Sequence, residues 1–440
     1  MSSLAKTDPQ IKKLIDLEEK RQAEVLEMIP SENYTSRAVM EALATVLTNK
    51  YSEGYPKKRY YQGNKIVDDI EALAQERAKK LFGVPYVNVQ PYSGSPANTA
   101  IYFALLEPQK DKIMGLTLAF GGHLTHGAPV SFSGKYFKTV PYELGRDSRL
   151  DMNAIEKLAI REKPKIIVCG FTAYAQIIDF KRFGLIADKV GAYLLADISH
   201  IAGLVVGGVH PSPVSYAHIV MTTTHKTLRG PRGAMIMVTE KGLKKDEELA
   251  EKIDKAVFPG LQGGPHDNQS AAIAVALKEA SSPVFKKYAK QVVTNSVKLA
   301  SELTKNGFDL VSGGSANHLI LIDLRNKGVN GSIAAYALEV ANIVVNKNGV
   351  PFDSNPPFYP SGIRLGTPAI TTRGMKEKEM KKIAQWFAGV IEEIKNERFP
   401  EEKEARIQFM KGFRIRTEHN RNLQKIAAEV KALTKNFPLP

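Results

Sequence analysis

Apolar residues recur along the chain in two patterns, and together these predict alternating strands and helices. Continuous apolar runs predict buried strands at residues 86–90, 112–118, 165–170, 192–197, 217–222 and 319–323. Apolar residues three or four positions apart predict helices at residues 8–28, 36–47, 68–82, 99–106, 150–162, 182–190, 284–305, 332–341 and 375–396. Buried strands that alternate with helices indicate an α/β fold whose mainly parallel sheet is covered on both faces.

A chain of 440 residues favours more than one domain. The order of the predicted elements divides it into an N-terminal helical arm (1–35), a large domain with the sheet (36–280) and a smaller C-terminal α/β domain (281–440). Residues beyond about 395 are rich in lysine and arginine and predict a basic helical tail on the small domain.

Composition narrows the class of protein. Hydrophobic residues make up 43% of the chain and charged residues 24%, which is typical of a soluble globular protein. No apolar run is long enough to span a bilayer, and the N-terminus lacks the apolar core of a secretion signal, so we expect a cytoplasmic protein with no membrane partner. The single cysteine, Cys169, excludes an internal disulfide and a thiolate metal cluster.

The net charge of +15 arises from 61 basic and 46 acidic residues. Such a balance fits nucleic acid, anionic small molecules or simply a solvated surface. Because lysines are spread over helical faces and no zinc finger or RNP-type motif is present, we expect a solvated surface and no nucleic-acid partner. His123 and His126 lie three residues apart, but no further ligand follows at metal-site spacing, so no metal is expected.

Asp197 and Lys226 follow neighbouring predicted strands. Lys226 comes 29 residues (226 − 197) after Asp197, with one further strand between them. Because parallel strands present their carboxyl ends at one edge of the sheet, we expect both side chains at that edge. Pyridoxal phosphate enzymes need this pair, since the lysine forms an imine and the carboxylate keeps the pyridine nitrogen protonated. Taken alone, Lys226 fits a solvated surface turn equally well.

The turn Ser93-Gly94-Ser95 lies between a predicted strand and a predicted helix. It offers backbone amides, hydroxyl groups and a favourable helix dipole to a phosphate group. Ser95 and Asn98 also fit ordinary helix caps. Together with the lysine and the carboxylate, the turn favours a pyridoxal phosphate site.

The segment from Tyr51 to Tyr61 is a predicted loop that contains Glu53. Loops dense in tyrosine, glutamate and arginine more often bind a ligand than fill a core. A dimer contact without chemistry remains the alternative for this loop.

Several blocks of the chain match, in order, those of one enzyme family. They are Ser31-Glu-Asn-Tyr-Thr-Ser36, Asn49-Lys-Tyr-Ser-Glu-Gly-Tyr-Pro56, Arg59-Tyr-Tyr61, Ser93-Gly-Ser-Pro-Ala-Asn98, Gly121-Gly-His-Leu-Thr-His-Gly127, Thr222-Thr-Thr-His-Lys-Thr-Leu228, Gln262-Gly-Gly-Pro265, Val345-Asn-Lys-Asn348 and Ser361-Gly-Ile-Arg-Leu-Gly-Thr-Pro-Ala-Ile370. On these blocks the chain, from about residue 8 to about residue 395, resembles the serine hydroxymethyltransferases, which are fold-type I pyridoxal phosphate enzymes. The resemblance implies a large cofactor-binding domain with a mainly parallel, seven-stranded type of sheet and a smaller C-terminal α/β domain. Gln62, Lys65 and Asn268 depart from the family pattern and are expected to affect subunit contacts.

The resemblance implies which residues bind the cofactor. Lys226 would hold pyridoxal 5'-phosphate covalently, Asp197 would face its pyridinium nitrogen, and His123 would stack on its ring. The phosphate would be bound by Ser93, Gly94 and Ser95 of one subunit with Tyr51 and Gly263 of the other. The ring and its phenolic oxygen would be lined by Thr172, His200, Thr223 and His225. The implied catalytic residues are Lys226, Glu53, Asp197, His123 and Thr223.

The resemblance also implies the substrates and the assembly. Arg364 would bind the carboxylate of serine or glycine, with Ser31 and Tyr61 beside it, and Glu53 of the neighbouring subunit would act as acid and base. Tetrahydrofolate, the co-substrate, would meet Leu118, Gly122, Asn348, Pro356, Pro357 and Phe358. The implied activity is the reversible transfer of the serine hydroxymethyl carbon to tetrahydrofolate, which gives glycine and 5,10-methylenetetrahydrofolate. The expected assembly is a homodimer with shared active sites, or a tetramer.

Two other functions compete with this interpretation. One is a threonine aldolase-like lyase of β-hydroxy amino acids, which the implied folate residues and Glu53 disfavour. The other is an RNA-binding scaffold without catalysis, which has no need of Lys226, Asp197 and Arg364.

Overall fold

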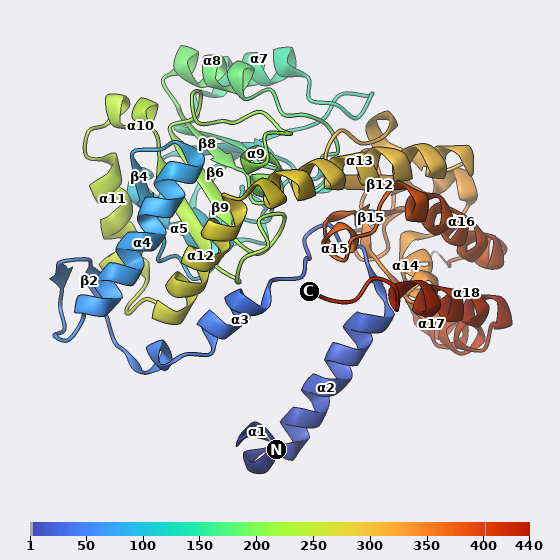
Figure 1. Ribbon diagram of the computed structural model, residues 1–440. Coiled ribbons are helices and arrows are strands. Elements are labelled where there is room, and N and C mark those ends of the chain that lie inside the picture. Colours follow the sequence, from blue (N-terminus) through green and yellow to red (C-terminus); the bar gives the residue numbers. More distant parts are fainter. Residues whose placement is uncertain (1–2, 401) are drawn as a thin grey trace. The chain divides into compact units, whose positions relative to one another are not determined.

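The computed structural model describes residues 3–400 and 402–440, and these form two compact units (Figure 1). The first, called here the sheet unit, comprises Thr35–Val293 and Ser315–Leu319. The second, called here the terminal unit, comprises the chain up to Tyr34 together with Thr294–Gly314 and Ile320–Pro440. Residues 1, 2 and 401, which fall within the predicted arm and small domain, lie outside the described residues. The division of the chain into an arm (1–35), a large domain (36–280) and a small domain (281–440) remains a prediction.

The sheet unit is built on seven strands in the order β4-β10-β9-β8-β7-β5-β6. Their bounds are Tyr86–Asn88 (β4), Ala234–Val238 (β10), Ile219–Thr223 (β9), Tyr193–Asp197 (β8), Ile166–Cys169 (β7), Lys112–Leu116 (β5) and Lys138–Tyr142 (β6). Strand β10 is antiparallel to both of its neighbours, and the other neighbouring pairs are parallel. The predicted α/β fold with a mainly parallel, seven-stranded sheet is therefore confirmed.

The inner strands bury side chains on both faces of this sheet. Ile167 and Leu194 lie in one hydrophobic core, whereas Ile166 and Leu195 lie in a second core on the opposite face. Alternate residues of a strand point to opposite faces. Burial on both sides explains why these strands are continuous apolar runs in the sequence.

Strand β6 is, with β10, one of the two strands of this sheet that are absent from the predicted set. It forms an edge, and of its residues only Val140 and Tyr142 are buried. Pro141 is tolerated there because an edge strand has an unpaired side that needs no backbone donor. An alternating edge strand of this kind does not appear as an apolar run.

Helices pack on both faces of the sheet (Figure 1). One core includes residues of α4 (Lys65–Phe82), α7 (Met152–Glu162), α8 (Phe180–Val190) and α12 (Asp267–Ala280), and the other includes residues of α5 (Gly94–Leu105) and α11 (Leu249–Lys255). Helix α8 begins where the Asp179 side chain accepts a hydrogen bond from the backbone of Arg182, and it ends at Gly191. The φ of 71° at Gly191 is the left-handed conformation that glycine adopts most easily.

Two predicted helices end earlier than their periodicity suggested. The helix expected at residues 8–28 is α2 (Pro9–Glu24), because residues Leu26–Glu27 form β1 and pair in parallel with β13 (Ile343–Val344). Main-chain hydrogen bonds from a distant segment override the helical periodicity there. The helix expected at residues 36–47 is α3 (Arg37–Leu43), which is followed by a 3-10 turn at Val46–Asn49.

The terminal unit has a core of its own. A four-stranded sheet with the order β11-β12-β15-β14 runs through Asp309–Leu310, Leu319–Asp323, Gly362–Gly366 and Asn346–Asn348. Around it lie α14 (Gly331–Val340), α16 (Glu377–Ile394), α17 (Lys403–Glu418) and α18 (Arg421–Thr434). Phe387 and Phe413 are fully buried in this core. The predicted helical tail thus consists of two helices whose apolar faces belong to the core of the unit.

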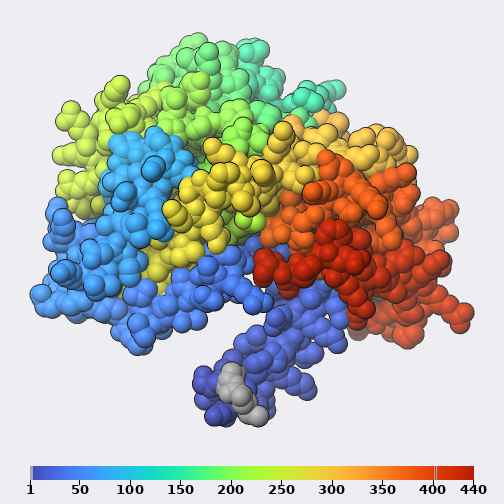
Figure 2. Space-filling view, in the orientation of Figure 1, coloured from blue at the N-terminus to red at the C-terminus, as the bar shows by residue number. Residues whose placement is uncertain are grey.

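Helix α2 exposes the apolar face that its periodicity predicted. Ile11, Leu14, Ile15 and Leu17 remain 46%, 61%, 49% and 52% exposed. Figure 2 shows this helix in dark blue, with its side chains uncovered on the face in view. An apolar stripe of this length is usually covered in the assembled protein.

Candidate active site

A cavity of about 180 Å³ lies at the carboxyl ends of β8 and β9 and at the start of α5. Its lining residues are Ser93, Gly94, Ser95, Asn98, His123, His126, Phe171, Thr172, Asp197, Ser199, His200, Met221, Thr223, His225, Lys226 and Arg232. All of them belong to the sheet unit. This is the edge of the sheet at which the sequence predicted the site.

Lys226 reaches the cavity from the segment that follows β9. Its Nζ donates a hydrogen bond to Oγ1 of Thr223, at 3.0 Å. The register of the sheet places Asp197, the last residue of β8, opposite Met221 of β9. The lysine and the carboxylate are therefore on adjacent strand ends, as predicted.

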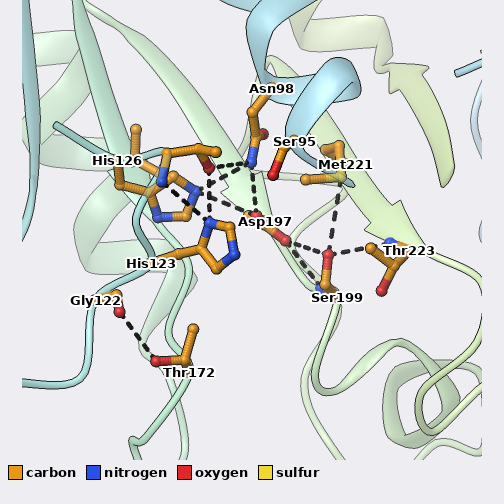
Figure 3. A network of polar contacts seen from close by, with 12 residues as sticks. Ser95, Asn98, Gly122, His123, His126, Thr172, Asp197, Ser199, Met221 and Thr223 are labelled. Atoms are coloured by element: carbon orange, nitrogen blue, oxygen red, sulfur yellow. Dashed lines mark hydrogen bonds and ion pairs between the residues drawn. The ribbon is translucent and has the colours of Figure 1, made fainter. Parts of the chain in front are cut away.

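Asp197 is 9% exposed and is held through both of its carboxylate oxygens (Figure 3). Oδ2 lies 3.1 Å from Nε2 of His126 and accepts a hydrogen bond from Nδ2 of Asn98, also at 3.1 Å. Oδ1 accepts hydrogen bonds from the backbone N–H and the hydroxyl of Ser199, at 3.1 Å and 2.5 Å. The carboxylate is thus fixed in position before any ligand binds.

These contacts determine the charge of Asp197. Burial by itself raises the pKa of the carboxyl group, but the hydrogen bonds from His126 and Ser199 and the electrostatic influence of the two nearby imidazoles outweigh that effect. The pKa lies well below its usual range as a result, and the group is ionised at neutral pH. An ionised carboxylate here is what a protonated pyridine nitrogen requires.

Two histidines of the cavity are neutral at neutral pH. Burial, assisted by the nearby His126 and Lys226 and opposed by Asp197, lowers the pKa of His123 to about 4. Burial, Lys226 and Arg232 lower the pKa of His225 to about 3. Nδ1 of His225 is buried and has no hydrogen-bond partner among the described residues. That atom is available to a polar group of a ligand.

The turn at residues 93–95 opens α5 toward Lys226. Ser93 is the N-cap of this helix, and Ser93, Gly94 and Ser95 all line the cavity. A Cβ atom on Gly94 would lie 2.7 Å from Cγ2 of Thr223, so only glycine leaves room between the turn and the strand. Free amides at the start of a twelve-residue helix suit a phosphate group.

Thr172 and His200 complete the lining that the resemblance implied. Oγ1 of Thr172 donates to the backbone oxygen of Gly122, at 2.9 Å (Figure 3). Nδ1 of His200 lies 3.2 Å from Nε2 of His318. Both contacts orient these side chains at the wall of the cavity.

Tyr51, Glu53 and Gly263 lie together, but none of them lines this cavity within the described residues. A Cβ atom on Gly263 would lie 3.2 Å from Oε1 of Glu53 and 3.8 Å from the Tyr51 hydroxyl. The rings of Tyr51 and Tyr61 meet edge to face, with centroids 5.1 Å apart. The structure thus brings the three residues predicted to act in a neighbouring subunit to one exposed place, with Tyr61 beside them.

The hairpin that carries Glu53 is held by one buried arginine. Strands β2 (Gly54–Tyr55) and β3 (Lys58–Arg59) flank its turn. Arg59 forms ion pairs with Asp68 at 2.8 Å and Glu71 at 2.6 Å, and donates to the backbone oxygens of Ser52 and Gly54. These bonds fix the backbone on both sides of Glu53.

The terminal unit contains Arg364, on β15. Its Nε donates to Oδ1 of Asn346 on β14, at 3.0 Å, and burial lowers its pKa to about 10. Gly366 of the same strand donates to the backbone oxygen of Met28, which leads into the segment of Ser31. Asn348 lies on β14, whereas Pro356, Pro357 and Phe358 form an exposed loop.

Of the remaining residues implied to meet folate, Leu118 and Gly122 lie in the sheet unit. Leu118 begins a 3-10 turn after β5 and is 44% exposed. A Cβ atom on Gly122 would lie 1.9 Å from the backbone oxygen of Leu116, so the chain turns back on itself there. The two residues frame a tight loop whose Leu118 side chain is open to solvent.

Sequence reasoning assigned no cofactor role to several residues of the cavity. They are Asn98, His126, Phe171, Ser199, Met221 and Arg232. Asn98 appeared as a helix cap, yet its Nδ2 donates to Asp197. His126 lies in the same matched block as His123, and that shared block was the one available signal for it.

The cavity fits pyridoxal phosphate. It combines a lysine amine, an ionised carboxylate, a helix start with two serines, and the partnerless Nδ1 of His225. Within residues 3–400 and 402–440, no group of three or more His, Cys, Asp or Glu side chains is arranged to hold a metal ion. No helix in the same described ranges is long and apolar enough to span a membrane.

Comparison with known proteins gives one consistent result. The family model described as serine hydroxymethyltransferase matches residues 4–387. A serine hydroxymethyltransferase of Acidothermus cellulolyticus is 55% identical over 441 aligned positions, which cover 100% of this chain and 97% of that protein. Those of Desulfotalea psychrophila and Acidobacterium capsulatum are 53% and 54% identical, covering 100% and 90% of this chain and 96% and 91% of their own lengths.

Proposed function

The chain belongs to the serine hydroxymethyltransferase family, and we propose from this how its residues carry out the reaction. The activity is the reversible transfer of the serine hydroxymethyl carbon to tetrahydrofolate, with pyridoxal phosphate as cofactor. The single observation that best supports the proposed roles is the cavity in which Lys226, Asp197 and the start of α5 come together. The aldolase-like alternative is disfavoured by full-length relatives that are serine hydroxymethyltransferases.

Lys226 is the residue proposed to carry the cofactor covalently. Its Nζ donates a hydrogen bond to Thr223, which orients the amine, and the residue follows the neutral His225 in the chain. When bound, pyridoxal phosphate supplies a ring that accepts the electron pair released from the broken bond of serine. Asp197 remains ionised and holds the proton on the ring nitrogen, while Ser93, Gly94 and Ser95 bind the phosphate.

His123 is proposed to stack on the cofactor ring, and Thr172 and His200 to bind its edge. A neutral imidazole suits this position, because a charged ring would repel a protonated pyridine. Oγ1 of Thr125 lies 2.7 Å from Nδ1 of His123 and fixes the plane of the imidazole. The flat face of the imidazole is thereby left for stacking.

Arg364 is proposed to bind the carboxylate of serine and glycine, with Ser31 and Tyr61 as further contacts. A guanidinium group binds a carboxylate through two parallel hydrogen bonds. Asn346 accepts a hydrogen bond from Nε of Arg364 and thereby orients the guanidinium group. Leu118, Gly122, Asn348 and residues 356–358 are proposed to contact tetrahydrofolate.

Glu53 is proposed to act in the site of a second copy of the chain, as the group that moves a proton near the serine hydroxyl. Two observations support a homodimer with shared sites. Glu53, Tyr51 and Gly263 cluster away from the cavity of their own chain. Helix α2 also leaves an apolar stripe uncovered. We place this enzyme in the cytoplasm.

Mixing two inactive variants tests the shared site. Glu53→Gln and Lys226→Ala homodimers should each be inactive. After mixing and subunit exchange, about half of the dimers should contain one copy of each variant. One of the two sites in each such dimer is complete, so about a quarter of all sites should be active. Glu53→Gln mixed with Arg364→Ala is a matched second pair with the same expectation. Mixtures that stay inactive, despite exchange demonstrated by mass spectrometry, contradict shared sites.

Cofactor absorbance and folate dependence test the proposed function itself. The purified protein should show visible absorbance that is lost in Lys226→Ala, and should convert serine to glycine only with tetrahydrofolate present. Lys244→Ala, an exposed lysine of the sheet unit, serves as the control. Cleavage of β-hydroxy amino acids without any folate-dependent transfer would contradict the proposal, as would a colourless protein after incubation with pyridoxal phosphate.

A further inference from the structure

A second pocket, of about 660 Å³, lies wholly within the terminal unit, between α14, β14 and α17. Its lining residues are Ser332, Ala335, Tyr336, Glu339, Val344, Val345, Lys347, Tyr359, Arg406, Ile407, Met410, Lys411 and Arg414. It shares none of the residues that line the cavity of Lys226. None of the roles proposed above uses these residues.

The pocket is strongly basic. Four cationic side chains line it, Lys347, Arg406, Lys411 and Arg414, against the single carboxylate of Glu339. The ion pairs formed among residues 3–400 and 402–440 include none of these four cations. Four clustered cations without acidic partners repel one another, and an anion between them relieves that repulsion.

Two of the cations lie over aromatic rings. The guanidinium of Arg406 lies 5.1 Å from the ring centroid of Tyr359, and that of Arg414 lies 5.3 Å from the centroid of Tyr336. A guanidinium that packs on one ring presents its other face to a second planar group. Arg414 is suited to this, because Arg406 already lies 5.8 Å from the centroid of a second ring, Phe399. Val345 and Met410 add apolar surface to the lining. The lining therefore suits a ligand with both negative charge and a flat apolar body.

Strand β14 separates this pocket from the side of Arg364. Asn346 points to Arg364, whereas its neighbours Val345 and Lys347 line the pocket, as the alternation of a strand requires. Nζ of Lys347 donates to the backbone oxygen of Phe358, at 2.6 Å. One cation of the pocket thus also holds the loop at residues 356–358.

We propose that this pocket binds a phosphate-bearing small molecule with a planar apolar body, of the nucleoside phosphate class. The phosphates lie among Lys347, Arg406, Lys411 and Arg414, and the planar body stacks on a guanidinium face. Occupancy draws Lys347 away from Phe358 and loosens the loop, which weakens tetrahydrofolate binding. This last step rests on the folate role proposed above for residues 356–358.

Calorimetric titration of the cofactor-loaded protein tests the site directly. ADP should bind at least about tenfold more tightly than pyrophosphate, which lacks the planar body, and adenosine should not bind measurably. The double variant Lys411→Gln/Arg414→Gln should weaken ADP binding by about tenfold or more, because it removes two phosphate contacts. Lys381→Gln removes a charge from an exposed position on α16 of the same unit and should leave the affinity unchanged.

Equal ADP affinity in the double variant and the parent protein would overturn the site, and equal affinity for pyrophosphate and ADP would overturn the planar-body requirement. For the link to folate, saturating ADP should raise the KM for tetrahydrofolate about threefold or more at constant kcat. An unchanged KM overturns that link. A protein without folate-dependent activity would count against the proposed function instead, since the titration does not depend on activity.

Discussion

Nε2 of His126 lies 3.1 Å from Oδ2 of Asp197, and both side chains are buried. The histidine thus acts on the cavity of Lys226 through the carboxylate. A carboxylate accepts and does not donate, so this contact requires the proton on Nε2. His126 is a positioning residue, because it stabilises the charge that Asp197 presents to the cavity.

His126→Phe should weaken cofactor binding by about ten- to a hundredfold, since losing the donor to a buried charged group costs about 1–3 kcal/mol. His126→Gln keeps a donor and should recover much of the affinity. Spectrophotometric titration of the apoprotein with pyridoxal phosphate measures both variants. If the Phe variant, the Gln variant and the parent protein bind pyridoxal phosphate with the same affinity, the contact between His126 and Asp197 does not contribute to cofactor binding.

Gly94→Ala should reduce cofactor affinity by tenfold or more. The added Cβ would lie 2.7 Å from Cγ2 of Thr223 and would push the start of α5 away from the strand end. Gly389→Ala is the matched control, because there the nearest atom is Cδ1 of Ile426, at 3.4 Å. That helical substitution should leave cofactor affinity unchanged and stabilise the fold by up to about 1 kcal/mol. If both alanine variants bind the cofactor like the parent protein, the turn is not in close contact with the phosphate.

Arg364→Lys should raise the KM for serine by about a hundredfold while the cofactor absorbance persists. Lysine preserves the charge but not the paired hydrogen bonds of a guanidinium, and losing one charge-assisted bond costs about 1.5–3 kcal/mol. Steady-state kinetics at fixed tetrahydrofolate measures the change. Arg325→Lys, at an exposed ion pair with Asp323 in the same unit, is the control. A serine KM within twofold of that of the parent protein would assign the carboxylate to another residue.

His218 should make the stability depend on pH. Its Nδ1 accepts the backbone N–H of Leu194 at 2.9 Å, and burial, assisted by Lys241 and Lys245, lowers its pKa to about 4. The unfolded chain binds this proton near pH 6.5, whereas the folded chain binds it only near pH 4. The free energy of unfolding is therefore unaffected by this group above about pH 6.5, and falls as the pH drops from about 6.5 to 4.

His218→Asn should flatten that part of the pH profile, because asparagine keeps an acceptor for Leu194 but does not titrate. Chemical denaturation of the apoprotein at several pH values between 4 and 7 measures the slope. His419→Gln, at the exposed C-cap residue that follows α17, should retain the slope of the parent protein. If the free energy of unfolding of the parent and of the His218→Asn variant depends on pH in the same way, His218 is not the cause of that dependence.

The relative placement of candidate site residues was predictable where chain order and strand pairing suffice to define it. Asp197 and Lys226 follow consecutive parallel strands, and consecutive parallel strands end at the same edge. Likewise Ser93, Gly94 and Ser95 lie where a strand passes into a helix, which is visible from the local pattern. Both inferences need only periodicity and the direction of the chain.

Other features depend on which distant segments pack together. Asn98 and His126 meet Asp197 across 99 and 71 residues of sequence, and no spacing rule signals such contacts. The end of the helix expected at residues 8–28 is instead extended, and residues 26 and 27 pair with residues 343 and 344. Local periodicity expresses the preferences of a few neighbouring residues. Polar groups that become buried must find hydrogen-bond partners. Which distant segment supplies each partner depends on how the whole chain packs.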